Sequence, residues 1–212
     1  MKMIIMSAQV WKTIRTGLFS ASFAEEGKRS TQINYFDGMG RSRQLNSINE
    51  SSLTSLISNN YFNKEGLKIF SSLPAPYKFE SENGREITYY VNFNRDANDE
   101  EYNFEDVSAD VCNLGASIMN VSSGAGRYYS SESDFQDDHH KFTPDAGGYP
   151  FSETVYKNDN TGRISMQGGA GPTLKINGGH ETKYFYGKAT QEELYRLFSL
   201  DVGNEKYYNK EE

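Results

Sequence analysis

The stretch that most constrains how this chain can fold is residues 31–47, because it carries the complete pattern of a β-hairpin. Ile33 and Tyr35 alternate with polar residues, the segment Asp37–Gly40 supplies a turn, and a basic, polar strand begins at Arg41. Aspartate can hydrogen-bond its own backbone two residues on, and glycine adopts positive φ without steric cost. An Asp-Gly pair between alternating strands therefore predicts a hairpin.

The residue order of this turn recurs along the chain. It runs aromatic, Asp or Asn, two residues, Gly, Arg, with one good copy at 35–41 and three poorer ones at 61–67, 142–148 and 155–163; Leu67 replaces the arginine in the second. A single hairpin cannot bury both of its faces, so such units are expected to stack side by side. The predicted turn residues are Tyr35, Phe36, Asp37, Gly38, Gly40, Arg41, Asn63, Gly66, Asp145, Gly148, Gly162 and Arg163.

The composition favours the same fold class. The 212 residues have a mean hydropathy of -0.74, yet they include 15 Tyr, 13 Phe and 19 Gly. This mixture suits many short strands joined by polar turns, with aromatic side chains covering the sheet, and it does not suit a helical bundle or a disordered chain. We expect a mainly β protein of consecutive antiparallel hairpins.

Charge and hydropathy exclude several classes of function. A net charge of -7 argues against a general nucleic-acid binder. The single cysteine, Cys112, excludes an internal disulfide framework, and no apolar run approaches the ~18–20 residues of a membrane helix. The N-terminus shows no export signal, so the chain is expected to stay inside the cell or to be part of something longer.

The order of elements follows from local patterns. Residues 1–22 read as an N-terminal extension, either a short amphipathic helix or a strand, before a single β-rich domain at 23–208 and a tail at 209–212. Pro74–Pro76 is expected to break the sheet, and the acidic segment Asp96–Asp110 to form a solvated loop. The predicted strands after the first hairpin are Ile57–Phe62, Leu67–Leu73, Ile87–Phe93, Leu114–Val121, Arg127–Tyr129, Phe151–Tyr156, Arg163–Met166 and Thr182–Tyr186.

One helix is predicted, at Thr190–Leu200. Thr190 and Glu193 have the spacing of a capping box, in which each side chain bonds a free backbone N–H of the first turn. Leu194, Leu197 and Phe198 form an apolar stripe at helical spacing.

Four segments together resemble a known family. They are FAEEGKRSTQINYFDGMGRSRQ (23–44), SLPAP (72–76), FTPDAGGYPFSETVYKNDNTGR (142–163) and GGHETKYFYGKATQEELYRLF (178–198). They resemble an N-proximal segment of bacterial Rhs/YD-repeat proteins over about residues 23–208. The most specific parts are the Tyr-Phe-Asp-Gly-x-x-Arg hairpin and the Gly-His-Glu-Thr-Lys-Tyr-Phe-Tyr-Gly run.

The resemblance implies a structural role. In that family, many hairpins join into a long sheet that spirals into a hollow shell, typically around a C-terminal toxin or effector, and the proteins are exported or displayed at the cell surface. The matching residues would then build strand-turn-strand units without a catalytic role or a cofactor. The chain lacks the Asp-Pro-x-Gly-x-x-Asp-Pro-x-Gly element that ends many shells, which suggests a truncated or orphan segment of a polymorphic toxin. Its partner would be further YD-repeat sheet, or another copy joined through strand edges.

Other functions rest on weaker patterns. Asp137-Asp138-His139-His140, with His180-Glu181, is the best metal-like cluster, but it lacks the spacing of a zinc site, so we predict a polar turn and no metal. Residues 168–175 faintly resemble a phosphate loop, although a proline intervenes and no helix is indicated. A small hydrolase using Cys112 or a serine would need flanking signatures that are missing.

The tyrosines support the main alternative, a stand-alone β-rich surface module that binds glycans. Rows of aromatic side chains on one sheet face can stack on sugar rings, but they can also simply be the packed face of a hairpin array, which the composition favours. The residues of this candidate ligand face are Tyr89, Tyr128, Tyr129, Tyr184 and Tyr186.

Overall fold

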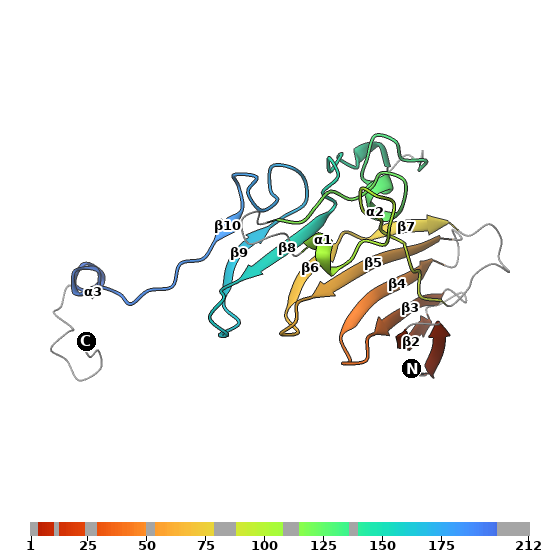
Figure 1. Cartoon of the computed structure of the whole chain (residues 1–212), viewed down its shortest axis with the longest axis horizontal. Coiled ribbons are helices and arrows are strands. Elements are labelled where there is room, and N and C mark those ends of the chain that lie inside the picture. The colour runs from red at the N-terminus through yellow and green to blue at the C-terminus, as the bar shows by residue number, and fades with distance from the viewer. Residues whose placement is uncertain are drawn as a thin grey trace.

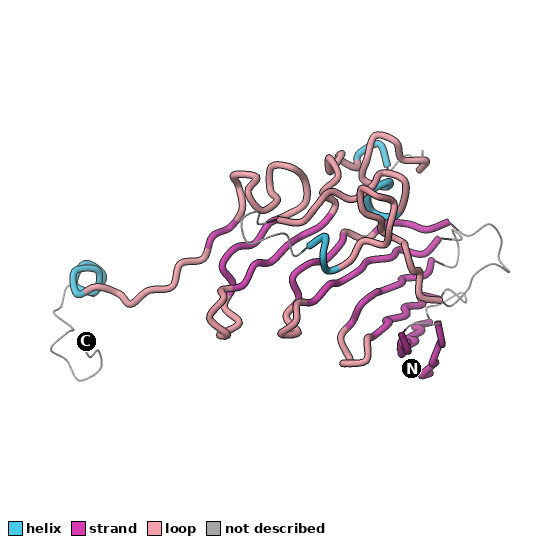
Figure 2. Tube along the Cα trace, viewed as in Figure 1, coloured by secondary structure: helices cyan, strands magenta, loops and turns pink. Residues whose placement is uncertain are grey.

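The computed structural model describes residues 4–10, 13–23, 29–49, 54–78, 88–107, 115–135 and 140–198. Within these ranges the protein is mainly β, as the sequence predicts, with loops and short helices over one face of a single sheet (Figure 1 and Figure 2). The strands are β1 (Ile4–Val10), β2 (Thr13–Phe23), β3 (Arg29–Phe36), β4 (Ser42–Asn49), β5 (Thr54–Phe62), β6 (Lys68–Ser72), β7 (Ala75–Lys78), β8 (Phe151–Tyr156), β9 (Ile164–Gly168) and β10 (Thr182–Lys183). The helices are α1 (Phe104–Val107), α2 (Gly124–Tyr128), the 3-10 turn η3 (His140–Phe142) and α3 (Gln191–Phe198).

The strands follow one another across the sheet almost in chain order. Among the described residues the order is β1-β2-β3-β4-β5-β6-β8-β9-β10, and all neighbouring pairs are antiparallel. β7 pairs with residues 54–57 of β5, while β6 pairs with residues 60–62 of the same strand. β6 and β7 therefore share one edge of β5. After β7 the chain leaves the sheet, and it rejoins the sheet at β8, beside β6.

Side chains alternate between two faces of the sheet, and one face is covered. The buried residues of successive strands lie opposite one another, as Tyr35, Gln44 and Asn59 do across β3, β4 and β5. Residues 88–107, 115–135, 140–150 and 169–179, which include α1 and α2, contribute the residues that bury this face; we call them the cover. The opposite face, which we call the open face, remains partly exposed.

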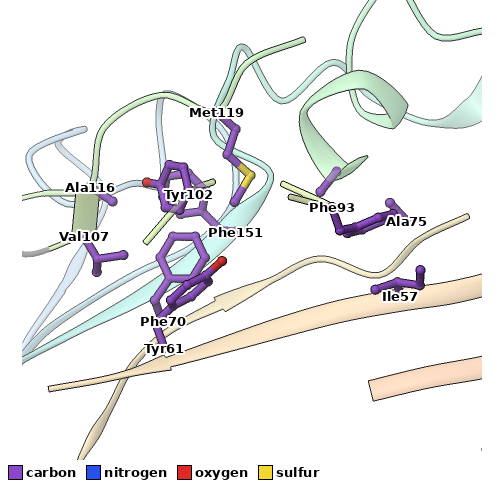
Figure 3. Packing of buried hydrophobic residues seen from close by; sticks show 11 residues of the cluster. Ile57, Tyr61, Phe70, Ala75, Phe93, Tyr102, Val107, Ala116, Met119 and Phe151 are labelled. Atoms are coloured by element: carbon purple, nitrogen blue, oxygen red, sulfur yellow. The ribbon is translucent and has the colours of Figure 1, made fainter. Parts of the chain in front are cut away.

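The core lies between the sheet and the cover and is centred on a cluster of aromatic rings (Figure 3). Phe70 of β6 packs with ring-centroid distances of 5.2 Å to Tyr61, 4.5 Å to Phe151 and 5.4 Å to Tyr102. Tyr102 comes from the cover and is fully buried, and its hydroxyl donates to the Ser117 carbonyl at 2.7 Å. Such ring pairs contribute about 0.5–1.5 kcal/mol each beyond the area they bury.

Polar side chains on the covered face fasten the cover to the sheet. The buried Gln44 amide accepts a hydrogen bond from the Tyr90 N–H at 2.9 Å and donates to the Tyr90 carbonyl at 3.0 Å. Asn46 donates to the Thr88 carbonyl at 3.2 Å. The backbone of residues 88–90 therefore finds its hydrogen-bond partners on side chains of β4, in the way that a neighbouring strand would supply them.

The N-terminal residues belong to the sheet, which corrects the prediction of an extension at 1–22. β2 pairs with β3 from Thr16, opposite Phe36, to Phe23, opposite Arg29. β1 in turn pairs with β2 over all of its seven residues. The predicted tail at 209–212 lies outside the described residues.

Three predicted strands in the cover are wrong as far as they are described. Thr88–Phe93 is irregular: Tyr89 and Phe93 enter the core, while Val91 is exposed and Asn92 has a φ of 57° in a turn. Residues 115–121 form no strand, and the predicted strand at 127–129 lies largely in α2. A Cβ atom on Gly124 or Gly126 of that helix would lie 2.1 Å from a backbone oxygen, so glycine allows its close approach.

Other predictions hold in part. Pro74–Pro76 does not end the sheet, because β7 continues along β5 with Pro76 opposite Leu56. The strand predicted at Leu67–Leu73 is present as β6 over Lys68–Ser72, where it buries Phe70 and Ser72. The strand predicted at 182–186 is regular only over Thr182–Lys183.

The predicted helix is present as α3, and its capping box is formed. The Thr190 N–H donates to the Glu193 carboxylate at 2.8 Å, and the Glu193 N–H donates to the Thr190 hydroxyl at 3.3 Å. These bonds satisfy two N–H groups of the first turn that have no partner within the helix itself.

Candidate functional site: a row of hairpin turns

The turn predicted at residues 37–41 joins β3 to β4 and is organised by one carboxylate. The Asp37 N–H donates to the Arg41 carbonyl at 3.0 Å, and the Gly40 N–H donates to the Asp37 carbonyl at 2.9 Å. Asp37 Oδ1 accepts the N–H groups of Met39 and Arg41, both at 3.0 Å. Gly40 has a φ of 74°, in the left-handed region that favours glycine.

An ion pair closes this first turn. Arg41 Nε lies 2.8 Å from Asp37 Oδ2, with both side chains largely shielded. Partial burial acts to raise the pKa of Asp37, but the hydrogen bonds from Arg41 and Met39 outweigh it and hold that pKa below its ordinary value. The aspartate is therefore ionised and fully engaged inside the turn at neutral pH.

The turn between β5 and β6 repeats this geometry with different side chains. The Asn63 N–H donates to the Leu67 carbonyl at 2.9 Å, and the Gly66 N–H to the Asn63 carbonyl at 3.0 Å. Asn63 Oδ1 accepts the Leu67 N–H at 2.8 Å, and Gly66 has a φ of 83°. The amide thus replaces the carboxylate as backbone acceptor, while Leu67 leaves no counterpart to the Asp37–Arg41 ion pair.

The turn between β8 and β9 is a longer version of the same unit. The Lys157 N–H donates to the Arg163 carbonyl at 2.7 Å, and Gly162 has a φ of 68°. Asp159 accepts the Thr161 N–H at 3.0 Å, and Arg163 Nη2 lies 2.9 Å from Asp159 Oδ2. The hydroxyl and N–H of Thr161, followed by the Arg163 guanidinium, lower the pKa of Asp159. The Asp-x-x-Gly-Arg spacing matches the first turn.

These turns project in a row at the same end of the strands (Figure 2). The Arg41 guanidinium lies over the ring of Phe62, 5.1 Å from its centroid, and Phe62 directly precedes the second turn. Gly162 of the third turn lies against Leu67: a Cβ atom there would be 3.9 Å from either leucine methyl. Arg163 lies 5.2 Å from the ring centroid of Tyr186 on the next segment. Each turn therefore contacts the next one along the sheet.

The fourth sequence copy, 142–148, does not form such a hairpin. Asp145 accepts the Gly147 N–H at 2.7 Å, and Gly148 has a φ of 83°, but the turn lies in the cover and leads into β8. Its backbone bonds instead to the residue that follows α2, where the Ala146 N–H donates to the Tyr129 carbonyl at 2.9 Å.

The structure contains a turn of this type that the sequence analysis missed. In the cover, the Asp96 N–H donates to the Glu100 carbonyl at 2.9 Å, and the Asp99 N–H to the Asp96 carbonyl at 3.1 Å. Asp96 Oδ1 accepts the N–H groups of Asn98 and Glu100. Asp99 occupies the glycine position with a φ of 67°. Aspartate tolerates this region better than most residues, so an Asp-x-x-Asp pattern is the signal that could have found the turn.

The candidate ligand-face tyrosines occupy three separate places. Tyr89 is buried against Tyr35, with ring centroids 5.8 Å apart, and that burial raises the pKa of Tyr35 to about 12. Tyr128 and Tyr129 pack on each other in the cover at 4.8 Å, and the Tyr129 hydroxyl donates to the Pro74 carbonyl. Tyr184 and Tyr186 lie on the last segment of the sheet and are exposed.

A cavity of about 320 Å³ lies between the second and third turns and α1. Leu67, Ile69, Val107 and Val155 line it, together with the buried carboxylate of Glu153. Glu153 Oε2 accepts the Ala116 N–H at 2.7 Å and Oε1 accepts the Ile176 N–H at 3.4 Å. Both carboxylate oxygens thus hold parts of the cover in place.

The residues of the metal, phosphate-loop and hydrolase alternatives are only partly described. Cys112 and residues 137–139 lie outside them, and His140 Nε2 contacts the Tyr128 carbonyl at 2.9 Å. No group of three or more potential metal ligands occurs in the described ranges. In the glycine-rich segment after β9, the N–H groups of Gly169 and Gly171 donate to the carbonyls of Leu174 and Tyr149 instead of converging on one point.

Comparison with known proteins adds no identification. No protein-family model matches the sequence, and neither does any curated protein. Among the described helices, none has the length and apolar character needed to cross a membrane.

Proposed function

We propose that this chain is a structural, non-catalytic segment of a β-shell of the Rhs/YD-repeat type, which it resembles in sequence. The observation that carries the proposal is the row of turns, in which Arg41 reaches Phe62 and Arg163 reaches Tyr186 at similar centroid distances of 5.1 and 5.2 Å. A cation over the aromatic residue that begins the next unit fixes neighbouring hairpins in register. The ion pairs Asp37–Arg41 and Asp159–Arg163 support the proposal too, because these charged side chains pair with each other inside the turns.

The polar side chains of the open face support a role as the inner wall of an enclosing shell. The Ser71 hydroxyl donates to Asn60 Oδ1 at 2.8 Å, and Asn60 Nδ2 donates to the Ser42 carbonyl at 3.2 Å. The Ser42 hydroxyl in turn bonds to Asn34. This band of uncharged groups runs across β3, β4, β5 and β6. Such a surface can face an enclosed protein without demanding a particular charge, which suits the encapsulating sheet of a polymorphic toxin.

The proposal is tested by asking whether the turns are equivalent structural units. We expect Asp37→Ala, Asn63→Ala and Asp159→Ala each to lower the free energy of unfolding, because each leaves backbone N–H groups of a hairpin turn without their acceptor. The expected loss is about 1–2 kcal/mol at Asp37 and less at the more exposed Asp159. Urea denaturation followed by circular dichroism measures it.

Asp145→Ala is the matched control, since Asp145 also caps a turn but outside the row. It is expected to change stability by less than about 0.5 kcal/mol, as surface substitutions do. If the three turn variants were no less stable than the control, the repeat interpretation and the structural role built on it would fail.

A further inference from the structure

The last segment of the sheet, residues 182–186, has a neighbouring strand on one side only, β9, within the described part of the chain. Tyr186 receives the Arg163 guanidinium as Phe62 receives that of Arg41, so it holds the position that begins a turn. Lys157 Nζ also lies over Tyr186, at 4.7 Å. After Lys188 the chain runs away from the sheet to α3 instead of turning back (Figure 1).

The outer edge of this segment offers free backbone groups. The Tyr184 N–H donates to the Ser165 carbonyl at 2.9 Å, so the backbone of Tyr184 faces β9. By the alternation of an antiparallel ladder, the N–H and C=O groups of Lys183 and Phe185 point away from β9. In the described residues no strand pairs with this edge. A row of unpaired groups of this kind is a template for another strand.

Exposed apolar side chains are concentrated in residues 184–198, on the last segment of the sheet and on α3. Of the fifteen exposed large hydrophobic residues in the described ranges, six lie between residues 184 and 198. They are Tyr184, Phe185, Tyr186, Tyr195, Leu197 and Phe198. Phe185 is 90% exposed, and α3 has no buried residue. An isolated helix of eight residues is marginal in water, so α3 needs a surface to pack on. Large apolar side chains left exposed in this way are where contact with a partner is expected.

We propose that a second copy of this chain occupies the edge, through antiparallel pairing of residues 182–186 with the same residues of the other copy. This deepens, and rests on, the proposed role as a sheet segment. An antiparallel partner that keeps the covered faces on one side is related by a two-fold axis perpendicular to the sheet. That axis brings the same strand of both copies together, which gives a closed, isologous dimer.

The register follows from the side chains. With Tyr184 opposite its own copy, Lys183 lies opposite Phe185 of the other chain, and the outward groups of Lys183 and Phe185 form the hydrogen-bonded pairs. A shift that places Lys183 opposite its own copy would oppose two like charges, which destabilises a cross-strand pair. Residues 187–190 carry α3 to the outer side of β10, away from β9, which is where the second copy would lie (Figure 1).

The test measures the mass of the full-length protein over a wide concentration range by sedimentation velocity. We expect a dimer for the natural sequence. Phe185→Lys places a lysine opposite Lys183 at both symmetric positions and should weaken the dimer about tenfold or more. Phe142→Lys is the matched control, because Phe142 is also a highly exposed phenylalanine but lies in the cover, and it should leave the dimer unchanged.

Disulfide trapping reports the register. In a Cys112→Ser background, Tyr184→Cys should give a crosslinked dimer on oxidation, because directly opposed residues lie about 4.5–5.5 Å apart, within disulfide range. Tyr186→Cys should not, since the two positions would be offset by four residues. A monomer at every concentration, or a dimer indifferent to Phe185→Lys, would overturn the pairing. Neither outcome would affect the structural role, which fails separately if the turn variants keep full stability.

Discussion

Glu153 shows how one residue can join two parts of the molecule. It lies on β8 opposite Phe70 and Gly168, on the covered face of the sheet. Its carboxylate accepts the N–H groups of Ala116 and Ile176, which belong to two separate parts of the cover. Burial raises its pKa above the ordinary value of 4.5, while the hydrogen bonds of Ala116 and Ile176 and the charge of Lys175 act in the opposite direction. The charged form is therefore tolerated in the core at a cost.

The effect of this cost on the stability of the fold depends on pH. Because the pKa is higher in the folded state, the folded protein holds the Glu153 proton more tightly, and stability falls as pH rises from about 4.5 through the raised pKa. Glu153→Gln carries no such charge, so we expect the stability of the natural protein to fall relative to this variant over that range, with a slope of at most about 1.4 kcal/mol per pH unit.

Urea denaturation at a series of pH values gives the difference, in which the titration of all other carboxylates cancels. Glu132→Gln, at an exposed position, serves as the control for the loss of one carboxylate. A difference for Glu153→Gln that does not change with pH would mean that the Glu153 carboxyl has no raised pKa.

Single residues were predictable where the local backbone decides the outcome. Asp37 and Asn63 cap turns because each lies three residues before a glycine that adopts positive φ. The same spacing at Asp145 gives no such hairpin, since the next residue, Ala146, bonds to Tyr129 just after α2. No turn was predicted at Asp96, because the residue with positive φ in that turn is Asp99 and not a glycine. Glu153 carries no sequence signal of its own, because its burial depends on loops distant in the chain.

At the level of elements, alternation predicted strands where pairing follows locally. It succeeded for the strands at 57–62 and 151–156, which pair with close neighbours. It failed for residues 88–93, because the same alternation arises when a loop sends every second or fourth side chain into a core. The side chain of Gln44 makes the hydrogen bonds to the Tyr90 backbone that a neighbouring strand would otherwise make. The sequence near residue 90 contains no signal of these bonds.

Gln44 is therefore expected to hold this part of the cover on the sheet. Gln44→Leu keeps much of the side-chain volume but removes both hydrogen bonds that the Gln44 amide makes to the Tyr90 backbone. We expect a loss of about 2–3 kcal/mol in the free energy of unfolding. Amide hydrogen exchange should accelerate at Tyr90 in particular.

Gln32→Leu is the comparison, because Gln32 lies on the neighbouring strand with its side chain exposed. It should change neither stability nor exchange at Tyr90 by much. Equal effects of both substitutions would show that the hydrogen bonds of Gln44 do not secure the cover.

At the scale of the whole molecule, the sheet and the cover share one core. Phe70 and Phe151 from the sheet contact Tyr102 from the cover, so removing either layer would expose the aromatic cluster. The composition indicated a β-rich chain with aromatic side chains to bury. It could not indicate that the described residues between β7 and β8, with 169–179 after β9, would leave the sheet in order to bury them.

A shared core predicts cooperative unfolding. We expect the transition seen by far-ultraviolet circular dichroism, which follows the strands, to coincide with that seen in the near ultraviolet, which follows the packed tyrosines. Tyr102→Ala should shift both together, by about 3–5 kcal/mol, as loss of a large buried ring does. Two separate transitions would instead mean that the cover unfolds as an independent unit.

The return of the chain to β6 also sets an order of events. β1 to β6 pair with neighbours that follow within a few residues to a few tens of residues, whereas Phe70 pairs with Glu153, about eighty residues later. Chain entropy opposes the closure of so long a loop more than that of a hairpin, by about 0.6 kcal/mol for each doubling of length. The first six strands can therefore assemble as soon as they exist. β8 can join β6 only when the intervening chain brings Phe151 to that edge, although β8 and β9 are joined by a short turn of their own.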